Sequence, residues 1–273
     1  MTLASTKDLA KKYDLFAKRS LGQNFLFDHK ITDKIANSAD ITENDNILEI
    51  GPGPAGLTRS ILNQSPKKLI TIEQDQRVMP ILEEIKQYYP DKLEILNADA
   101  LETPIKNLFN GEKFKIIANL PYNIGTELVF RWLDDINLID SMTILLQKEV
   151  VQRIVAKSGS KKYGRLSVMI NFQCFTKTLF DIAAGSFVPA PKVTSSLVQI
   201  TPREHIIADI DLKILSKLCA CAFNQRRKML RSSLKSFAND VESLLKACNI
   251  DSSLRAEQLE LEDFAKLVQN YKS

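Results

Sequence analysis

Histidine and cysteine are scarce in this sequence, and their positions argue against metal chemistry. Among 273 residues there are two histidines, His29 and His205, which lie far apart in the chain, and four cysteines. No two cysteines show the CxxC spacing of a structural zinc site. We therefore expect no metal ion, and thiols that are reduced and mostly buried.

Long hydrophobic runs are also absent, and no stretch approaches the length of a membrane span. Charged residues interrupt the N-terminal segment where a signal peptide would need an apolar core: Lys7, Asp8, Lys11, Lys12 and Asp14. A hydrophobic content of 44% in a chain of this length suffices for one large domain and a small one. We expect a cytoplasmic, monomeric protein that does not bind membranes.

Acidic residues are missing from two stretches, although the net charge of the whole chain is only +4. Between Val150 and Phe180 there are six basic residues: Arg153, Lys157, Lys161, Lys162, Arg165 and Lys177. The segment Phe223–Lys235, which we expect to form about three turns of helix, contains five: Arg226, Arg227, Lys228, Arg231 and Lys235. Such runs also occur on solvated surfaces, but the lack of any acidic residue favours contact with the phosphates of RNA or DNA.

Two apolar runs in the first half of the chain end in residues suited to a nucleotide. Ile47–Ile50 leads directly into Gly51, Gly53 and Gly56, which have the dinucleotide-binding spacing and would bring a helix N-terminus toward an anionic group. The next run, Leu69–Ile72, ends at Glu73, where a carboxylate could accept both hydroxyls of a ribose. This pattern predicts strand, glycine turn, helix and strand in succession.

Two later runs place further polar residues at strand ends. The run Leu93–Leu96 leads to Asp99, which could accept a hydrogen bond from an adenine amine. The run Phe114–Leu120 carries Asn119 near its end. Because ligands of open α/β sheets bind at the carboxyl ends of the strands, we predict a nucleoside-containing cofactor there. The glycine pattern alone suits NAD as well as S-adenosylmethionine, but Glu49 argues against NAD, whose sites usually keep that strand end apolar.

The stretch Asn119, Leu120, Pro121 and Tyr122 combines an amide, backbone carbonyls and an aromatic ring. The Asn119 side-chain oxygen and a nearby carbonyl can each accept one hydrogen of a nucleobase amine, which draws the nitrogen lone pair out of the ring plane toward an electrophile. Tyr122 could stack on the base. The alternative is a strand end closed by a turn at the proline.

Two loops could cover a ligand bound at these strand ends. In Ser20–Leu26 we expect Asn24 to bind the ligand and Leu26 to cover it; the alternative is a helix cap with a hydrophobic staple. Pro189 and Pro191 stiffen the loop that begins at Phe187. Phe187 is therefore either the second ring around a base, opposite Tyr122, or a core residue.

The remaining pattern predicts an α/β domain followed by helices. A helix over 124–133, a strand over 142–146 and a helix from Gln147 precede two β-rich stretches, Phe172–Ile182 and Ser195–Ile200. After Pro202 the hydrophobic period is helical throughout. We therefore predict two domains, 1–202 and 203–273.

With these residues in view, the chain resembles the small-subunit ribosomal RNA adenine dimethyltransferases, the kasugamycin-sensitivity family. Segments that carry the resemblance occur in order along nearly the whole chain: 21–26, 49–53, 119–124, 147–150, 163–168, 187–193 and 223–230. The resemblance implies a class I S-adenosylmethionine-dependent methyltransferase. Its fold would be a Rossmann-like, seven-stranded sheet with an antiparallel last strand and a small all-helical C-terminal domain that binds rRNA.

The resemblance also implies substrate and site. S-adenosyl-L-methionine would contact Asn24, Leu26, Gly51, Glu73, Asp99 and Asn119. From the residue types themselves we expect the target base to be surrounded by Asn119, Leu120, Pro121, Tyr122 and Phe187. From the two basic stretches we expect RNA to be bound by Arg153, Lys161, Lys162, Arg165, Arg226, Arg227, Lys228 and Arg231. The implied substrate is 16S rRNA in the small ribosomal subunit or its precursor, at two adjacent adenosines near the 3′ end.

Three other functions stay open from the sequence. An erythromycin-resistance-type methyltransferase would act on large-subunit rRNA with the same chemistry. An assembly factor would use only the basic surfaces. An NAD oxidoreductase is disfavoured because neither histidine lies near a strand end that could face a nicotinamide.

Overall fold

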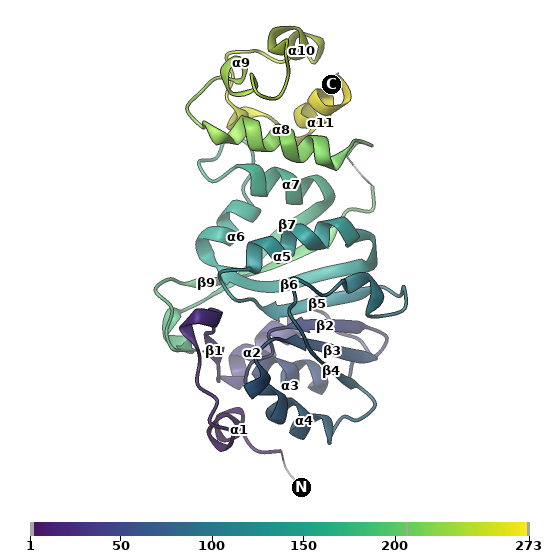
Figure 1. The fold of residues 1–273 in the computed structure, drawn as a ribbon, viewed down its shortest axis with the longest axis vertical. Helices are drawn as coiled ribbons and strands as arrows, with labels where there is room; N and C mark the ends of the chain where they lie inside the picture. Colours follow the sequence, from purple (N-terminus) through teal and green to yellow (C-terminus); the bar gives the residue numbers. More distant parts are fainter. Residues whose placement is uncertain (1–2, 206, 272–273) are drawn as a thin grey trace. The chain divides into compact units, whose positions relative to one another are not determined.

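The computed structural model describes residues 3–205 and 207–271, which form two compact units (Figure 1). The first unit contains Met1–Val151 and Lys177–Pro202, and the second contains Gln152–Thr176 and Arg203–Ser273. The last residue of the first unit is Pro202, and residues 152–176 group with the C-terminal helices. The reason for this grouping is packing, since the helix in this segment lies against two helices of the C-terminal region. The division into domains 1–202 and 203–273 stays a prediction.

The first unit is built on a mixed sheet of seven strands (Figure 1). In spatial order the strands are β4 (Leu93–Asn97), β3 (Lys68–Glu73), β2 (Asn46–Ile50), β5 (Phe114–Asn119), β6 (Ile139–Gln147), β9 (Ser195–Pro202) and β7 (Cys174–Ile182). Neighbours from β4 to β6 pair in parallel, whereas β9, the last strand of the chain, pairs antiparallel with β6. The expected seven-stranded sheet with an antiparallel last strand is confirmed.

The central strands are buried along almost their whole length because both faces of the sheet are covered. Every residue of β2 is buried, and β3 and β6 are nearly so, as is typical of parallel strands between helices. The helices of this unit are α1 (Thr6–Lys12), α2 (His29–Asn37), α3 (Gly56–Asn63), α4 (Met79–Lys86) and α5 (Gly125–Trp132), with α6 (Lys148–Ile154) at its end. The four parallel strands β2 to β5 therefore present their carboxyl ends at one edge.

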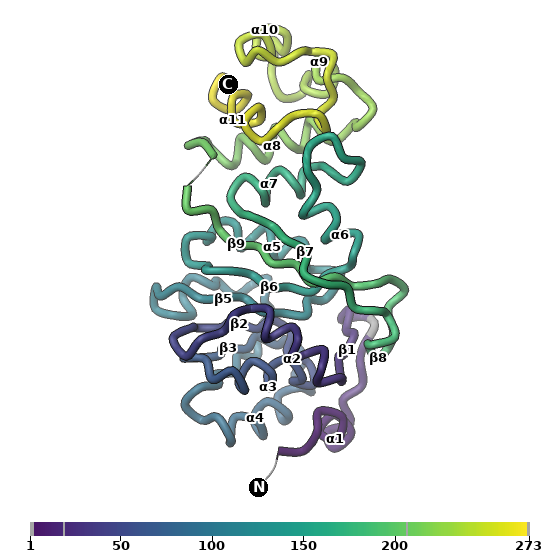
Figure 2. The backbone as a smooth tube through the Cα atoms, turned by 180° about the vertical axis from the view of Figure 1, so that it is seen from behind, coloured from purple at the N-terminus to yellow at the C-terminus, as the bar shows by residue number. Residues whose placement is uncertain are grey.

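A two-stranded ribbon lies apart from the main sheet. The short strands β1 (Phe25–Leu26) and β8 (Phe187–Val188) pair antiparallel and run side by side (Figure 2). Leu26 lies opposite Phe187 in this pairing, and both side chains are buried in the hydrophobic core. The ribbon joins the N-terminal segment to the loop that precedes β9.

The second unit is helical apart from the start of β7. Its helices are α7 (Arg165–Gln173), α8 (Leu212–Asn224), α9 (Leu230–Ser233), α10 (Val241–Ala247) and α11 (Leu261–Gln269). Helix α8 packs against α7, α9 and α11. Within the described ranges, no helix is both long and apolar enough to cross a membrane.

The predicted continuous helix over 223–235 was wrong. Helix α8 ends at Asn224, a turn follows, and α9 begins only at Leu230. The backbone N–H groups of Leu230 and Arg231 donate to the carbonyls of Leu254 and Ser252, so a neighbouring segment takes the bonds that a continuous helix would need. Leu230 and Leu234 are nevertheless buried, as the periodicity indicated.

Candidate active site

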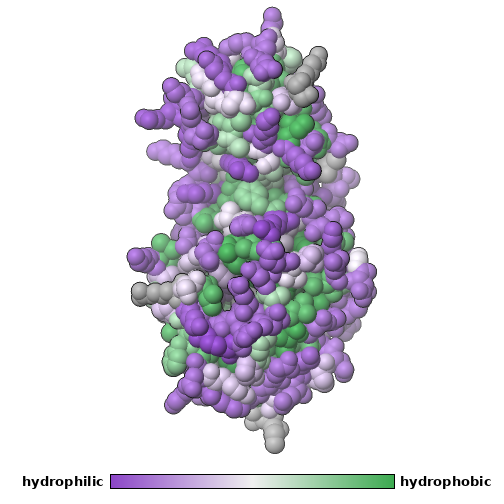
Figure 3. Space-filling view, viewed as in Figure 1, coloured by the Kyte–Doolittle hydropathy of each residue, from purple (hydrophilic) through white to green (hydrophobic). Residues whose placement is uncertain are grey.

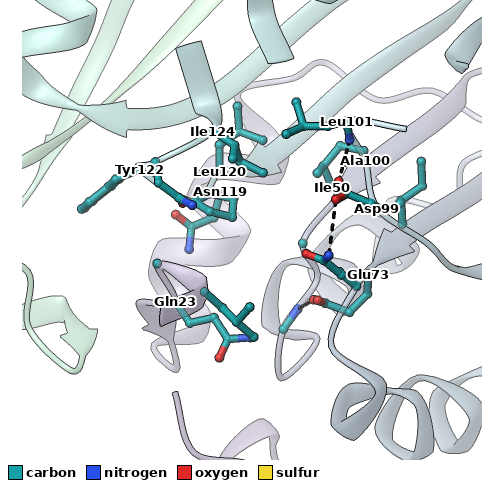
Figure 4. A pocket seen from close by; sticks show the side chains of 18 of the residues that line it. Gln23, Ile50, Glu73, Asp99, Ala100, Leu101, Asn119, Leu120, Tyr122 and Ile124 are labelled. Carbon is teal, nitrogen blue, oxygen red and sulfur yellow. Dashed lines mark hydrogen bonds between the residues drawn. The ribbon is translucent and has the colours of Figure 1, made fainter. Parts of the chain in front are cut away.

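A cleft opens at the carboxyl ends of β2, β3, β4 and β5. Its empty volume is about 990 Å³, open solvent at the mouth included. Figure 4 shows Asn119 and Tyr122 on one wall, Glu73 and Asp99 on the opposite wall, and Gln23 between them at the base of the view. Residues predicted from four separate strand ends therefore line one cavity.

The wall formed by β2 and β3 is organised around Glu73. Its carboxylate accepts hydrogen bonds from the backbone N–H of Gly53 at 3.2 Å and of Asp75 at 2.9 Å. Gly51 and Gly53 both have positive φ angles, which glycine adopts without strain. Burial raises the pKa of Glu73, and the backbone donors partly oppose that rise. The glycine turn and the carboxylate thus hold each other in place.

Asp99 lies beyond the end of β4 on the same wall. One carboxylate oxygen accepts the backbone N–H of Leu101 at 2.8 Å, and the other accepts the amide of Gln74 at 3.3 Å (Figure 4). Both bonds leave lone pairs on the carboxylate, because each oxygen can accept more than one donor. Asp99 is therefore held in orientation and can still accept a ligand donor.

Asn119 ends β5 on the opposite wall. Its side-chain nitrogen donates to the backbone carbonyl of Asn24 at 3.1 Å, which fixes the amide and leaves its oxygen to accept another donor. The carbonyl of Pro121 accepts from Ile124 and Gly125 at the start of α5. That carbonyl is consequently engaged by the helix.

Tyr122 completes this wall. Its hydroxyl forms a hydrogen bond of 2.5 Å with the side chain of Ser195 at the start of β9. Burial raises the pKa of Tyr122, so the phenol is neutral at physiological pH. The ring is half-buried and lines the cleft. The bond to Ser195 anchors the Tyr122 side chain at the edge of the cleft.

Of the residues predicted to bind the cofactor or the target base, two do not line this cleft. Phe187 is only 2% exposed and belongs to the core, so core packing, the second of its two interpretations, is what the structure shows. Leu26 is 5% exposed and contacts a smaller adjacent pocket instead of the main cleft. Both residues are drawn inward because β1 pairs with β8 at this point.

Several polar residues in or beside the cleft were not among the predicted site residues. Gln23 and Gln74 line the main cleft, and Asp75 binds Gln23 from below it. Glu49 lines the smaller pocket and is 1% exposed, and its Oε2 atom has no hydrogen-bond partner among the described residues. Burial, reinforced by the nearby Glu73 carboxylate, raises the pKa of Glu49 to about 8. The position of Glu49, just before the first glycine, was the available signal for it.

The two basic stretches meet within the second unit. The guanidinium of Arg226 donates to the carbonyls of Lys161 and Tyr163, at 2.8 and 3.2 Å, and forms an ion pair with Glu257. Arg165 donates to Ser216 of α8. Arg227, Lys228 and Arg231 are exposed. Arg226 therefore links two segments that lie more than sixty positions apart in the chain.

Neither histidine lines the cleft, and the described part of the chain holds no cluster of three or more histidine, cysteine or acidic side chains that could bind a metal ion. The site is instead made of amide, carboxylate and carbonyl oxygens beside an aromatic ring.

Comparison with known proteins identifies the family of the chain. The model for "Ribosomal RNA adenine dimethylase" matches residues 15–273. The chain belongs to the ribosomal RNA adenine dimethylase family. The protein is thus an rRNA adenine dimethyltransferase with a class I methyltransferase fold.

Individual members of the family are similar over nearly the full chain. "Ribosomal RNA small subunit methyltransferase A" of Afipia carboxidovorans is 45% identical over 97% of this chain and 95% of its own length. The protein of the same name from Agrobacterium fabrum is 44% identical over 97% and 96%. A dimethyladenosine transferase from Plasmodium falciparum superposes with a TM-score of 0.79 at 27% identity, over 90% of this chain and 96% of that one.

A second solved structure shares the fold alone. The 23S rRNA methyltransferase ErmE superposes with a TM-score of 0.69 at 23% identity, covering 90% of this chain and 99% of its own. The architecture is therefore common to enzymes of both ribosomal subunits, and the fold by itself does not select the RNA.

The buried carboxyl of Glu49 should make stability depend on pH. The folded protein keeps this carboxyl protonated up to about pH 8, whereas the unfolded chain releases the proton near 4.5. The contribution of the protonated carboxyl is therefore fully present below about pH 4.5 and is lost as the pH rises through about 8. Between roughly pH 5 and pH 8, Glu49→Gln should lose less stability than the wild type in urea unfolding.

The exposed Glu43→Gln variant is the control for removal of a carboxyl, because Glu43 is exposed to solvent. It should follow the wild-type curve. Parallel curves for Glu49→Gln and the wild type would show that Glu49 is ionised in the folded state.

Proposed function

We propose that this protein dimethylates the N6 amines of two adjacent adenosines in a hairpin loop near the 3′ end of 16S rRNA, using S-adenosyl-L-methionine, in late small-subunit biogenesis. The observation that carries the proposal is the side chain of Asn119, whose nitrogen is engaged by Asn24 while its oxygen can accept an amine hydrogen. Relatives at 44–45% identity bear the name of the small-subunit enzyme. The protein would act in the cytoplasm, as a monomer.

The residues present fit S-adenosylmethionine. Glu73, buried at the end of β3, can accept the ribose hydroxyls, and Asp99 can accept the amine of the cofactor's adenine. The positive φ angles at Gly51 and Gly53 let the backbone approach the ligand closely, and Asn24 borders the same cleft. When bound, the cofactor supplies an electrophilic methyl group on a sulfonium.

Asn119 and Leu120 act on the target amine. The amide oxygen of Asn119 accepts one amine hydrogen and the carbonyl of Leu120 accepts the other, since the Pro121 carbonyl is engaged by α5. Both bonds draw the lone pair toward the methyl group, so no general base is needed before attack. Held in this way, the amine nitrogen would be placed to accept the methyl group that a bound cofactor would release from its sulfonium, and the amine would then give up a proton to water. One hydrogen remains for the second transfer.

Tyr122 holds the base. The adenine leaves its stack in the RNA and enters the cleft, where the ring of Tyr122, fixed by Ser195, stacks on it. Such stacking contributes about 1–3 kcal/mol per base. Phe187 is buried in the core, where its strand pairs with β1 at Leu26, so it does not supply the second stacking face that the sequence allowed.

The rival rRNA target is the large subunit. The likeness to ErmE concerns the fold alone, whereas the relatives at more than 40% identity are named for the small subunit. The test must therefore include both RNAs.

The direct test incubates the protein with S-adenosylmethionine and small subunits from an unmethylated strain, and quantifies dimethyladenosine in digested rRNA by mass spectrometry. We expect dimethylation of two adjacent adenosines. Asn119→Ala should reduce transfer by about 100-fold or more, because the amine is no longer oriented.

Large subunits serve as the control RNA and should stay unmodified. Methylation of large-subunit rRNA alone would replace the proposed target. If the protein binds subunit and cofactor normally but transfers no methyl group, the result would support an assembly factor instead of an enzyme.

We further propose that basic residues of the second unit, which includes residues 203–273, bind the rRNA backbone. These residues are Arg153, Lys161, Lys162, Arg165, Arg226, Arg227, Lys228 and Arg231. Hydrophilic residues project from much of this unit on the face in the upper part of Figure 3. Because Arg226 links the two basic segments internally, the exposed Arg227, Lys228 and Arg231 are the better probes of RNA contact.

Replacing Arg227, Lys228 and Arg231 by alanine should weaken binding to small subunits and flatten its salt dependence. Each lost phosphate contact lowers the slope of log K against log salt by about 0.7 to 0.9. Titration of subunit binding at several salt concentrations measures this slope. Alanine at the exposed Lys7, Lys11 and Lys30 of the first unit removes the same charge and should leave the slope unchanged; equal flattening in both variants would refute a local RNA surface.

A further inference from the structure

Asp75 lies two residues beyond Glu73 and forms a buried hub of hydrogen bonds. Its carboxylate is only 7% exposed. One oxygen accepts the backbone N–H and the Nε of Arg77, and the other accepts the Nη2 of Arg77 at 2.5 Å and the side-chain amide of Gln23 at 2.9 Å. Although burial raises the pKa of Asp75, the bonds from Arg77 and Gln23 lower it overall. The group is therefore a permanent acceptor at neutral pH.

Gln23 connects this hub to the N-terminal loop. Its amide nitrogen donates to Asp75, and its amide oxygen accepts the backbone N–H of Lys18 at 2.9 Å. Both ends of the side chain are thus engaged, which fixes the backbone on either side of it. Gln23 also lines the cleft between the two walls (Figure 4).

The residues beside Gln23 reach the opposite wall. Gly22 has a φ of +64°, and a Cβ at this position would lie 2.6 Å from the side-chain oxygen of Asn123. Asn24 donates its side-chain amide to the carbonyl of Gly22 at 3.2 Å. The backbone carbonyl of Asn24 then accepts the side-chain nitrogen of Asn119. The orientation of Asn119 therefore depends on where this loop is held.

The same chain of hydrogen bonds also reaches the wall formed by β2 and β3, where Glu73 lies. The backbone N–H of Asp75 donates to the Oε1 atom of Glu73 at 2.9 Å. Hydrogen bonds and the short loop backbone consequently join five residues in sequence: Glu73, Asp75, Gln23, Asn24 and Asn119. The residue that would bind the ribose and the residue that would orient the amine share one support.

We propose that Gln23 and Asp75 are positioning residues that hold the Asn24 carbonyl where it fixes the amide of Asn119 for methyl transfer. The proposal rests on the role given to Asn119 in the proposed function. Because the pair acts through Asn119, its loss should reduce kcat more than it weakens cofactor binding. A loop that merely covered the ligand would instead change affinity.

The test reverses the polarity of the Gln23–Asp75 bond. Gln23→Glu places a carboxylate against Asp75 and should lower kcat by at least about tenfold, with cofactor affinity changed by less than about threefold. In the double variant with Asp75→Asn, the carboxylate introduced at position 23 can accept both the Lys18 N–H and the new side-chain amide at position 75. The kcat of the double variant should exceed that of Gln23→Glu by at least about threefold, whereas two independent effects would make the double variant slower than either single variant.

A second readout does not need activity. The side-chain amide of Asn119, identified by NMR as the signal missing from Asn119→Ala, should move in Gln23→Glu and return in the double variant. Gln64→Glu is the matched control, since Gln64 bonds the side chain of Asn37 and does not line the cleft; it should change neither readout.

Two results would overturn the positioning role. One is a Gln23→Glu variant with normal kcat and an unmoved Asn119 signal, and the other is a double variant with no recovery in either readout. An inactive wild type would overturn the proposed function, whereas the Asn119 signal would still decide whether the pair positions this side chain.

Discussion

The hydrogen bond from the Asn119 side chain to the carbonyl of Asn24 joins two residues 95 positions apart, and the arrangement of the cleft depends on it. An amide can rotate so that either its nitrogen or its oxygen faces a ligand. Donation to Asn24 engages the nitrogen and presents the oxygen, which is the atom an exocyclic amine requires. A loop of the N-terminal segment thereby sets the chemistry at the end of a central strand.

The cleft separates two tasks between its walls. Glu73 and Asp99 present carboxylates, which suit the hydroxyls and amine of a nucleoside cofactor, and backbone donors hold both of them. Asn119 and Tyr122 present an amide and a ring, which suit a flat base. Neither wall supplies a strong base, and methyl transfer to an amine needs none before attack. Orientation is then the main source of rate enhancement.

Strand-end residues could be predicted from the sequence because the rule that governs them is local. Glu73, Asp99 and Asn119 follow apolar runs, and parallel strands bring such ends to one edge. Asp75 could not be assigned, since its role depends on Gln23, which lies 52 residues earlier in the chain. Phe187 remained ambiguous for the same reason: a buried aromatic residue and a stacking one look alike until the pairing with β1 is known.

The helical C-terminal region shows the same limit. Its hydrophobic periodicity correctly indicated buried residues such as Leu230 and Leu234. Periodicity does not, however, reveal where a helix is interrupted. The break before Leu230 arises from bonds to Leu254 and Ser252, which tertiary structure alone provides. Breaking the helix left Arg227 and Lys228 in an exposed turn beside the other basic segment.

The division of tasks between the walls is tested most directly by measuring S-adenosylmethionine affinity, by calorimetry, in Asn119→Ala and Glu73→Ala. The account predicts that Glu73→Ala loses about 10- to 100-fold in affinity, as expected for lost hydrogen bonds to a charged group. Asn119→Ala should retain affinity within about threefold, while its methyl transfer falls by about 100-fold or more. An equal loss of affinity in both variants would contradict the account.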